Sequence, residues 1–137
     1  MKFLLSFLAL ITVIFGCVSS KNNADTNLTG SWELSVFPTT DKTFEEVFGQ
    51  RKPELQFDQS KNTVSGSTGC NRINGSYSAD KAAFSFGSNL AMTKMACPGY
   101  EESVFLDALN RINRYEISNG QLRFMHDSTL VMSFARK

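Results

Sequence analysis

Residues 115–134 read YEISNGQLRFMHDSTLVMSF and carry the clearest strand pattern in the chain. Apolar side chains recur at every second position in three short runs, as they do in strands with one buried face. Asn119-Gly120 separates the first two runs and suits a tight hairpin turn, because both central residues of that turn take positive φ. The polar residues 126–128 separate the second and third runs. This stretch therefore predicts three antiparallel strands joined by tight turns.

The same alternation continues upstream, where Trp32, Leu34 and Val36 alternate with polar residues in a strand predicted at 31–36. Further strands are predicted at 54–57, around Val64, and at 76–78, 83–86 and 90–94. Short strands at such regular spacing, eight or nine in all, are typical of an antiparallel meander.

Three glycines, Gly66, Gly69 and Gly75, interrupt the middle of this region. Because glycine weakens a regular ladder, we expect bends or bulges here. Asn74-Gly75 predicts a hairpin turn for the same reason as Asn119-Gly120.

Two helices are predicted among the strands. Residues 44–48 follow a capping box formed by Thr43 and Glu46, and Gly49 is suited to end this short turn. A longer amphipathic helix covers about 100–113 and begins after a Pro-Gly pair. The apolar stripe of this longer helix consists of Val104, Phe105, Ala108, Leu109 and Ile112.

An antiparallel meander must bury its apolar face and protect its edges. Curling into a barrel with the helix over one opening does both. The predicted fold class is therefore mainly β (α+β), a partly open antiparallel β-barrel packed on one amphipathic helix at about 100–113.

The composition excludes several classes of function. The 137 residues include 14 Lys and Arg against 13 Asp and Glu, which leaves a formal net charge of +1 and no basic excess for nucleic acid. The single histidine, His126, lies beside Asp127 in a predicted turn, so we interpret it as a surface residue and predict no metal site and no cofactor. Glu45-Glu46 and Glu101-Glu102 are interpreted as solvated charges near helix N-termini.

The N-terminus has the features of an export signal. Residues 3–15 are an uncharged apolar run, too short to cross a bilayer as a helix, which takes about 20 residues. Ile14-Phe15-Gly16-Cys17 resembles a bacterial lipobox, in which cleavage leaves an N-terminal cysteine for acylation. We predict a lipoprotein signal peptide at 1–16, a lipidated Cys17 with a flexible tether at 17–27, and a folded domain at 28–137. An ordinary signal peptide with a free Cys17 is the alternative.

Acylation of Cys17 would attach the domain to a membrane through three acyl chains, which is enough for stable anchoring. The expected location is the bacterial cell envelope, as an outer-membrane lipoprotein. The folded unit is expected to be monomeric.

Cys70 and Cys97 are the two cysteines that remain once Cys17 is lipidated. An even pair in an exported domain is most simply a disulfide. Two buried thiols and a redox-active pair stay open as alternatives, although the chain lacks the C-x-x-C motif of many redox proteins.

Three local patterns together resemble the META domain, the HslJ-like family of bacterial lipoproteins. They are Gly66-Ser-Thr-Gly69-Cys70-Asn71, the stretch 90–97 with Thr93-x-Met95-Ala96-Cys97, and the opening Trp32-x-Leu34. The resemblance covers nearly all of 28–137 and implies a partly open β-barrel wrapped on a helix, an envelope location, and an association with envelope stress and drug tolerance. It implies no defined catalytic chemistry, so it assigns no catalytic residue. The motif residues it singles out as structural are Trp32, Gly69, Asn71, Thr93, Met95 and Ala96.

The polar motif residues have a structural interpretation. The Asn71 amide can bond backbone groups that the bends leave unpaired, and the Thr93 hydroxyl can do the same. Met92 and Met95 are expected to fill the core.

The leading hypothesis is a non-enzymatic, lipid-anchored envelope protein that acts through contact with an unknown protein partner. The first alternative is a carrier or sensor of a small hydrophobic ligand in the barrel mouth, lined by some of the nine phenylalanines downstream of Cys17. A thiol-based enzyme is the third reading.

Overall fold

The computed structural model describes residues 25–39 and 41–137. The predicted signal peptide at 1–16, the predicted lipidation site Cys17 and most of the predicted tether lie outside the described residues.

The described residues form nine strands and two helices. In chain order they are β1 (Gly30–Val36), α1 (Phe44–Phe48), β2 (Glu54–Asp58), β3 (Thr63–Ser67), β4 (Arg72–Asp80), β5 (Ala83–Phe86), β6 (Ala91–Met92), α2 (Glu102–Arg111), β7 (Arg114–Ser118), β8 (Gln121–His126) and β9 (Thr129–Arg136). The capping box of Thr43 and Glu46 is present at α1, which ends at Gly49, as predicted.

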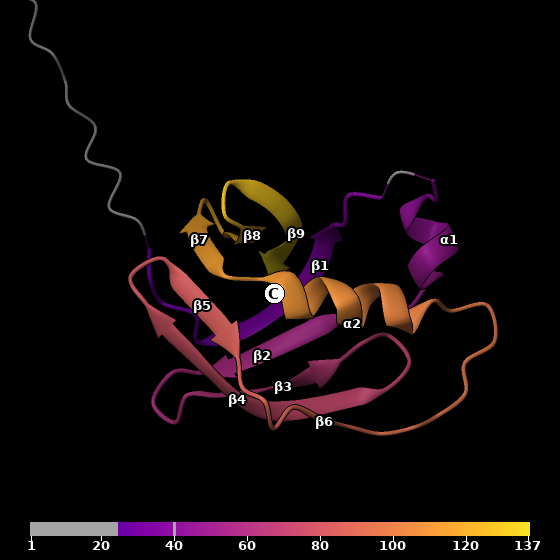
Figure 1. Cartoon of the computed structure of the whole chain (residues 1–137), viewed down its shortest axis with the longest axis horizontal. Coiled ribbons are helices and arrows are strands. Elements are labelled where there is room, and N and C mark those ends of the chain that lie inside the picture. Colours follow the sequence, from indigo (N-terminus) through magenta and orange to yellow (C-terminus); the bar gives the residue numbers. More distant parts are fainter. Residues whose placement is uncertain (1–24, 40) are drawn as a thin grey trace, which may run out of the picture.

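The strands form a closed antiparallel barrel (Figure 1). Their order is β3-β2-β1-β9-β8-β7-β5-β4, and a β3–β4 ladder closes the ring, while β6 adds to β4 as a ninth strand. The β5–β7 seam is the thinnest, with one ladder pair between Ala83 and Arg114. The predicted fold class, a β-barrel with one amphipathic helix, is confirmed.

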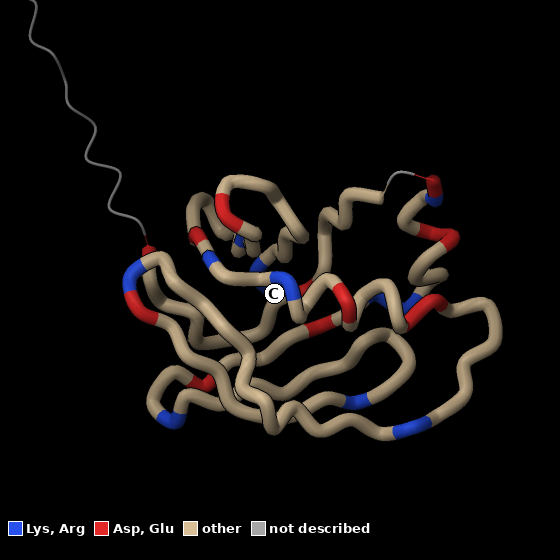
Figure 2. The backbone as a smooth tube through the Cα atoms, viewed as in Figure 1, with Lys and Arg blue, Asp and Glu red and all other residues tan. Residues whose placement is uncertain are grey.

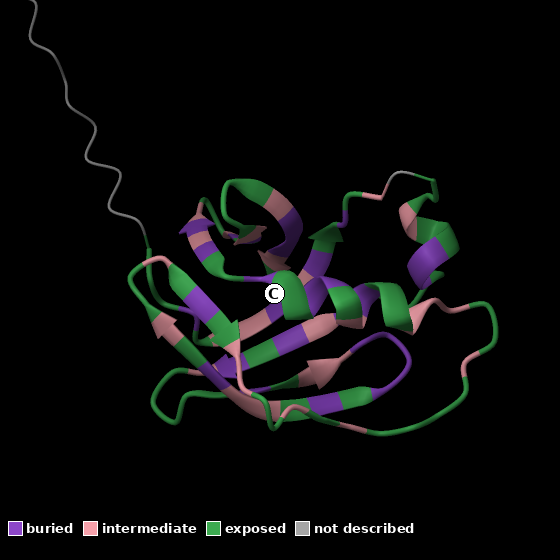
Figure 3. Cartoon of the chain, in the orientation of Figure 1, coloured by how far each residue is buried: buried purple, intermediate pink, exposed green. Residues whose placement is uncertain are grey.

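Aromatic rings fill the barrel, and buried positions recur along its strands and along α2 (Figure 3). Phe84 and Phe124 have ring centroids 4.8 Å apart, and Phe57 lies 6.1 Å from Phe84. Helix α2 contributes buried side chains and contacts both α1 and β9. Its predicted stripe is confirmed at Phe105, Ala108, Leu109 and Ile112, whereas Val104 is 36% exposed.

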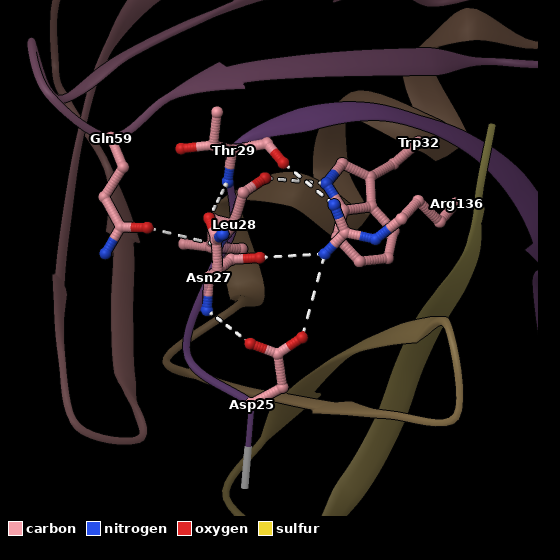
Figure 4. A network of polar contacts seen from close by, with 7 residues as sticks. All are labelled: Asp25, Asn27, Leu28, Thr29, Trp32, Gln59 and Arg136. Carbon is pink, nitrogen blue, oxygen red and sulfur yellow. Dashed lines mark hydrogen bonds and ion pairs between the residues drawn. The ribbon is translucent and has the colours of Figure 1, made fainter.

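A second cluster ties the two ends of the described chain together (Figure 4). The Arg136 guanidinium stacks over the Trp32 ring at 4.2 Å and donates to the carbonyls of Asn27 and Thr29 at 3.0 and 2.9 Å. The same guanidinium lies 3.9 Å from the Asp25 carboxylate. Among the described residues, Asp25 and Asn27 of the predicted tether thus contact the barrel.

Two bulges shift side chains away from the predicted alternation. In β1 the register with β9 skips Ser35, so Val36 is 46% exposed and Phe37 enters the core instead. The prediction that Val36 faces inward was therefore wrong. In β9 the register with β8 skips Val131, which leaves Val131 and Met132 both buried.

The predicted hairpin turn at Asn74-Gly75 was also wrong, because both residues lie inside β4 and pair with β3. Gly66 likewise sits in a regular ladder rather than a bend. A Cβ on Gly66 would lie 2.0 Å from the Glu54 carbonyl oxygen, and one on Gly75 would lie 3.0 Å from the Leu90 Cα. These two glycines thus allow close approach of neighbouring backbone.

The Gly66 contact predicts a strong response to one methyl group. Gly66→Ala should lower the free energy of unfolding by at least about 2 kcal/mol, because the backbone of β2 must move to admit the Cβ. Urea unfolding would measure the loss. Ser65→Ala, an exposed neighbour in the same strand, is the control and should change stability by less than about 0.5 kcal/mol. Equal stability of the two variants would contradict the packing described here.

Candidate functional site

The turn between β3 and β4 consists of residues 68–71, Thr-Gly-Cys-Asn. Gly69 has a φ of +96°, and a Cβ there would lie 2.2 Å from the Arg51 carbonyl oxygen. Only glycine meets both conditions without strain. The G-C-N stretch is therefore the hairpin turn of this part of the barrel, which the sequence had suggested only as a bend.

The Asn71 side chain is buried in this turn, with 1% of its surface exposed. Its Oδ1 accepts from the Met95 N–H at 2.7 Å and from the Thr93 hydroxyl at 2.8 Å. Its Nδ2 donates to the Met95 carbonyl at 3.2 Å and to the Glu102 carboxylate at 2.8 Å. The amide thus uses both acceptor and both donor positions, and two of its partners are backbone groups.

The segment after β6 runs along the start of β4 by means of these contacts. Met92 pairs with Ile73 in the ladder, and the Thr93 N–H then donates to the Arg72 carbonyl at 3.1 Å. The Arg72 N–H in turn donates to the Thr93 hydroxyl at 3.0 Å. Thr93, Met95 and Cys97, at alternate positions of the T-x-M-x-C stretch, therefore contact the G-C-N turn. This contact explains the spacing of the residues in the two motifs.

Cys70 and Cys97 are joined in a disulfide, with Cα atoms 6.0 Å apart. The bond closes a loop with a sequence separation of 27 residues that contains β4, β5 and β6. On the chain-entropy account such a crosslink stabilises the fold by about 3–4 kcal/mol. The disulfide also holds Cys97, at the end of the segment after β6, against the turn.

Two further residues of the cluster were not predicted from the sequence. Thr68 is fully buried, and its hydroxyl accepts from the Asn71 N–H at 2.8 Å while donating to the Glu102 carboxylate. The interpretation of Glu102 as a solvated charge was wrong, because its two oxygens bind Thr68 and Asn71. A Ser-Thr pair before a Gly-Cys turn was the available signal for Thr68, since hydroxyls often bond nearby turn amides. For Glu102 no local signal existed.

Tyr100 packs against this cluster. Its hydroxyl is buried without a hydrogen-bond partner among the described residues, and the nearby Thr68 proton is already committed to Glu102. Burial, together with the negative charge of Glu102, raises the pKa of the Tyr100 hydroxyl well above its ordinary value.

The motif methionine differs from expectation. Met95 was predicted to fill the core, but its side chain is 57% exposed, because only its backbone binds Asn71. Met92 is half-buried against the core. Ala96 is exposed, and Trp32 belongs to the separate cluster at Arg136.

Met95 borders a surface groove of about 1030 Å³ beside the turn. A second hollow of about 650 Å³ continues it along the outer face of β2, β3 and β4, and the two share Gln56, Ser65 and Asn74. The shared lining is polar and uncharged. Arg51, Glu54 and Arg72 supply charge at the end near the turn. We call this surface, from the turn along these three strands, the loop-side groove.

The remaining candidates for chemistry lie elsewhere. His126 is exposed, with Nδ1 2.7 Å from the Arg111 carbonyl oxygen, and is 3.8 Å from Asp127. Within residues 25–39 and 41–137, no three His, Cys, Asp or Glu side chains gather as possible metal ligands. In the same part of the chain, neither helix has the length and apolar character needed to span a bilayer.

The fold and the site together define a class: a small antiparallel barrel whose G-C-N turn is clamped by a disulfide and by an amide to a T-x-M-A-C segment. The profile of the META domain matches residues 26–137, so the chain belongs to the META domain family, as the sequence motifs predicted.

Solved structures agree with this fold. An NMR structure of a protein from Burkholderia xenovorans is 29% identical, with a TM-score of 0.60 and coverage of 80% of this chain and 83% of that one. A crystal structure of a DUF4847 family protein from Bacteroides vulgatus is 15% identical, with a TM-score of 0.61 and coverage of 80% and 94%. The latter likeness concerns the fold alone. No curated protein matches the chain significantly.

The four bonds of Asn71 predict a large effect of its removal. Asn71→Ala should lower the free energy of unfolding by about 2–4 kcal/mol, because the Glu102 carboxylate and the Met95 backbone lose partners in a buried place. Asn71→Asp should cost at least as much, since it places a carboxylate against Glu102, and adding Glu102→Gln should recover part of that loss. Asn74→Ala, at an exposed position of β4 three residues further along the chain, is the control. Chemical denaturation in which Asn71→Ala is no worse than Asn74→Ala would refute the role given to this amide.

The unpartnered hydroxyl predicts that Tyr100→Phe keeps or raises stability at neutral pH, by up to about 1 kcal/mol. Since the pKa of Tyr100 is raised in the folded state above the ordinary value of about 10, the folded protein keeps a proton that the unfolded chain loses. The contribution of this hydroxyl to the free energy of unfolding is therefore fully present below pH 10 and is lost as the pH rises above 10. Tyr100→Phe should flatten this decline without abolishing it, because burial also raises the pKa of Tyr77 and Tyr115. The measurement is the free energy of unfolding of both proteins between pH 8 and 11. If Tyr100→Phe and the wild type lose stability with the same slope against pH, the Tyr100 hydroxyl is not buried in the folded state.

Proposed function

We propose that this protein is a non-enzymatic component of the bacterial cell envelope, held at a lipid surface by acylated Cys17, which binds a protein partner through the loop-side groove. The finding that supports this best is the groove itself, a large surface hollow beside a turn that several independent contacts hold in place.

The geometry of attachment favours such a role. From Cys17 to Asp25 the chain spans 25 − 17 = 8 residues, which reach at most about 29 Å when extended. The described chain begins at one end of the barrel, while the turn at 68–71 lies at the opposite end (Figure 1). A domain tethered in this way keeps close to its membrane and presents the turn away from the point of attachment.

A rigid turn also suits binding. The disulfide, the Asn71 amide and the Thr68–Glu102 contact fix the backbone of residues 68–71 before any partner arrives. Preorganisation of this kind reduces the entropy lost on association.

The alternatives have less support. The interior that would hold a hydrophobic ligand is occupied by rings such as Phe57, Phe84 and Phe124 in mutual contact. The bond between Cys70 and Cys97 leaves neither sulfur as a thiolate nucleophile while it is oxidised. We therefore infer a binding role rather than catalysis or transport.

Site-specific photo-crosslinking in intact cells tests the proposal. A photoreactive residue at Ser67 or Met95, both in the loop-side groove, should give a discrete adduct with one envelope protein. The matched control is Arg123, an exposed position on β8. Cys17→Ser should abolish the adduct and release the protein from the membrane fraction. Equal adducts at all three positions, or a Cys17→Ser protein that fractionates like the wild type, would overturn the proposal.

A further inference from the structure

Residues 91–96 consist of β6 and the four residues after it, and one backbone edge of this segment is bonded along the start of β4. The N–H groups of Thr93 and Met95 point toward β4 and the turn before it, where they donate to the Arg72 carbonyl and the Asn71 Oδ1 at 3.1 and 2.7 Å. Because successive backbone groups in a strand point in opposite directions, those of Met92, Lys94 and Ala96 point away from β4.

This outer edge has no neighbour in the described structure. Strand β7 pairs with β5 only at Ala83, and its ladder does not extend to β6. The amides of Lys94 and Ala96 have no hydrogen-bond partner among residues 25–39 and 41–137. Five of the six residues in 91–96 are exposed, and the segment is mostly green in Figure 3. An open edge of this kind is a template for an added strand.

The charges around the edge indicate what kind of strand it accepts. Between Asp80 and Glu101 the charged residues are Lys81 and Lys94, and Lys94 is at the centre of the edge. Arg72 lies on the adjoining strand, and Figure 2 shows blue without red along this rim. A second copy fits poorly, because symmetric antiparallel pairing about Lys94 would set two lysines directly opposite each other. An acidic side chain in that position would be favourable instead.

We propose that the outer edge of residues 92–96 docks an extended, acidic segment of a partner protein, which adds to β6 as the next strand with a carboxylate opposite Lys94. This inference rests on the proposed binding role and specifies the chemistry of the partner. The backbone supplies the hydrogen bonds, and Lys94 supplies the selection for negative charge.

The test uses the isotope-labelled, exported protein in detergent and a fluorescent peptide of about nine residues in which valine alternates with glutamate. Saturable binding should shift the amide signals of Lys94 and Ala96 and protect them from solvent exchange. The amide protons of Thr93 and Met95, which are already bonded, should keep their exchange rates. The same peptide with lysine in place of glutamate, and an acidic peptide interrupted by proline, should bind at least about tenfold more weakly.

Lys94→Glu should weaken the acidic peptide by at least about tenfold and reverse the preference for charge. Lys81→Glu makes the same change of net charge at the β4–β5 turn and should have no effect. Absence of saturable binding to the wild type, equal binding of the lysine peptide, shifts at Gln56 and Ser65 instead, or a dimer formed through residues 92–96 would each overturn the strand-pairing proposal. If photo-crosslinks form in the loop-side groove but the acidic peptide does not bind, the proposed binding role is supported and only the strand-pairing proposal is refuted.

Discussion

The side-chain amide of Asn71 is the contact on which the functional end of this barrel depends. It lies in a turn with almost no exposure, and all four of its hydrogen-bonding positions are occupied. Two of these bonds go to the N–H and the carbonyl of Met95, as the bonds of a paired strand residue would. They keep the chain after β6 alongside the start of β4, beyond the last residue pair of the β4–β6 ladder. A buried polar group is costly unless it is fully bonded. The buried amide is therefore fully bonded in only one arrangement of the turn at 68–71, the segment after β6 and helix α2.

The remaining features of the site follow from that arrangement. The disulfide secures the far end of the segment, and Glu102 draws the first turn of α2 onto Thr68 and Asn71. Because the backbone of Met95 carries the bonds, its side chain is left outside, beside the groove. The same pairing leaves one edge of residues 91–96 without a neighbour. A structural clamp thus creates both surfaces to which we assign binding.

Much of the barrel could be predicted because its determinants are local. Period-two alternation and turn residues identified the strands, and the positive φ values at Asn119, Gly120 and Asp127 match the predicted turns. The errors share one cause: each depended on a neighbour distant in sequence. Gly75 was assigned to a turn, yet it is glycine because Leu90 approaches it, and Val36 faces outward because a bulge against β9 shifts the register. The sequence of a single strand does not indicate such contacts.

The sequence by itself determined the class of the fold and the family, because alternation and motif spacing can be read along one chain. It favoured a disulfide between Cys70 and Cys97, and the structure contains that bond. It also carries the expectation of lipidation at Cys17. Only the tertiary structure decided that Glu102 joins the turn, that Met95 is exposed and that the edge of residues 92–96 is open. These properties depend on which backbone groups find partners across the fold, and that is settled only when distant segments meet.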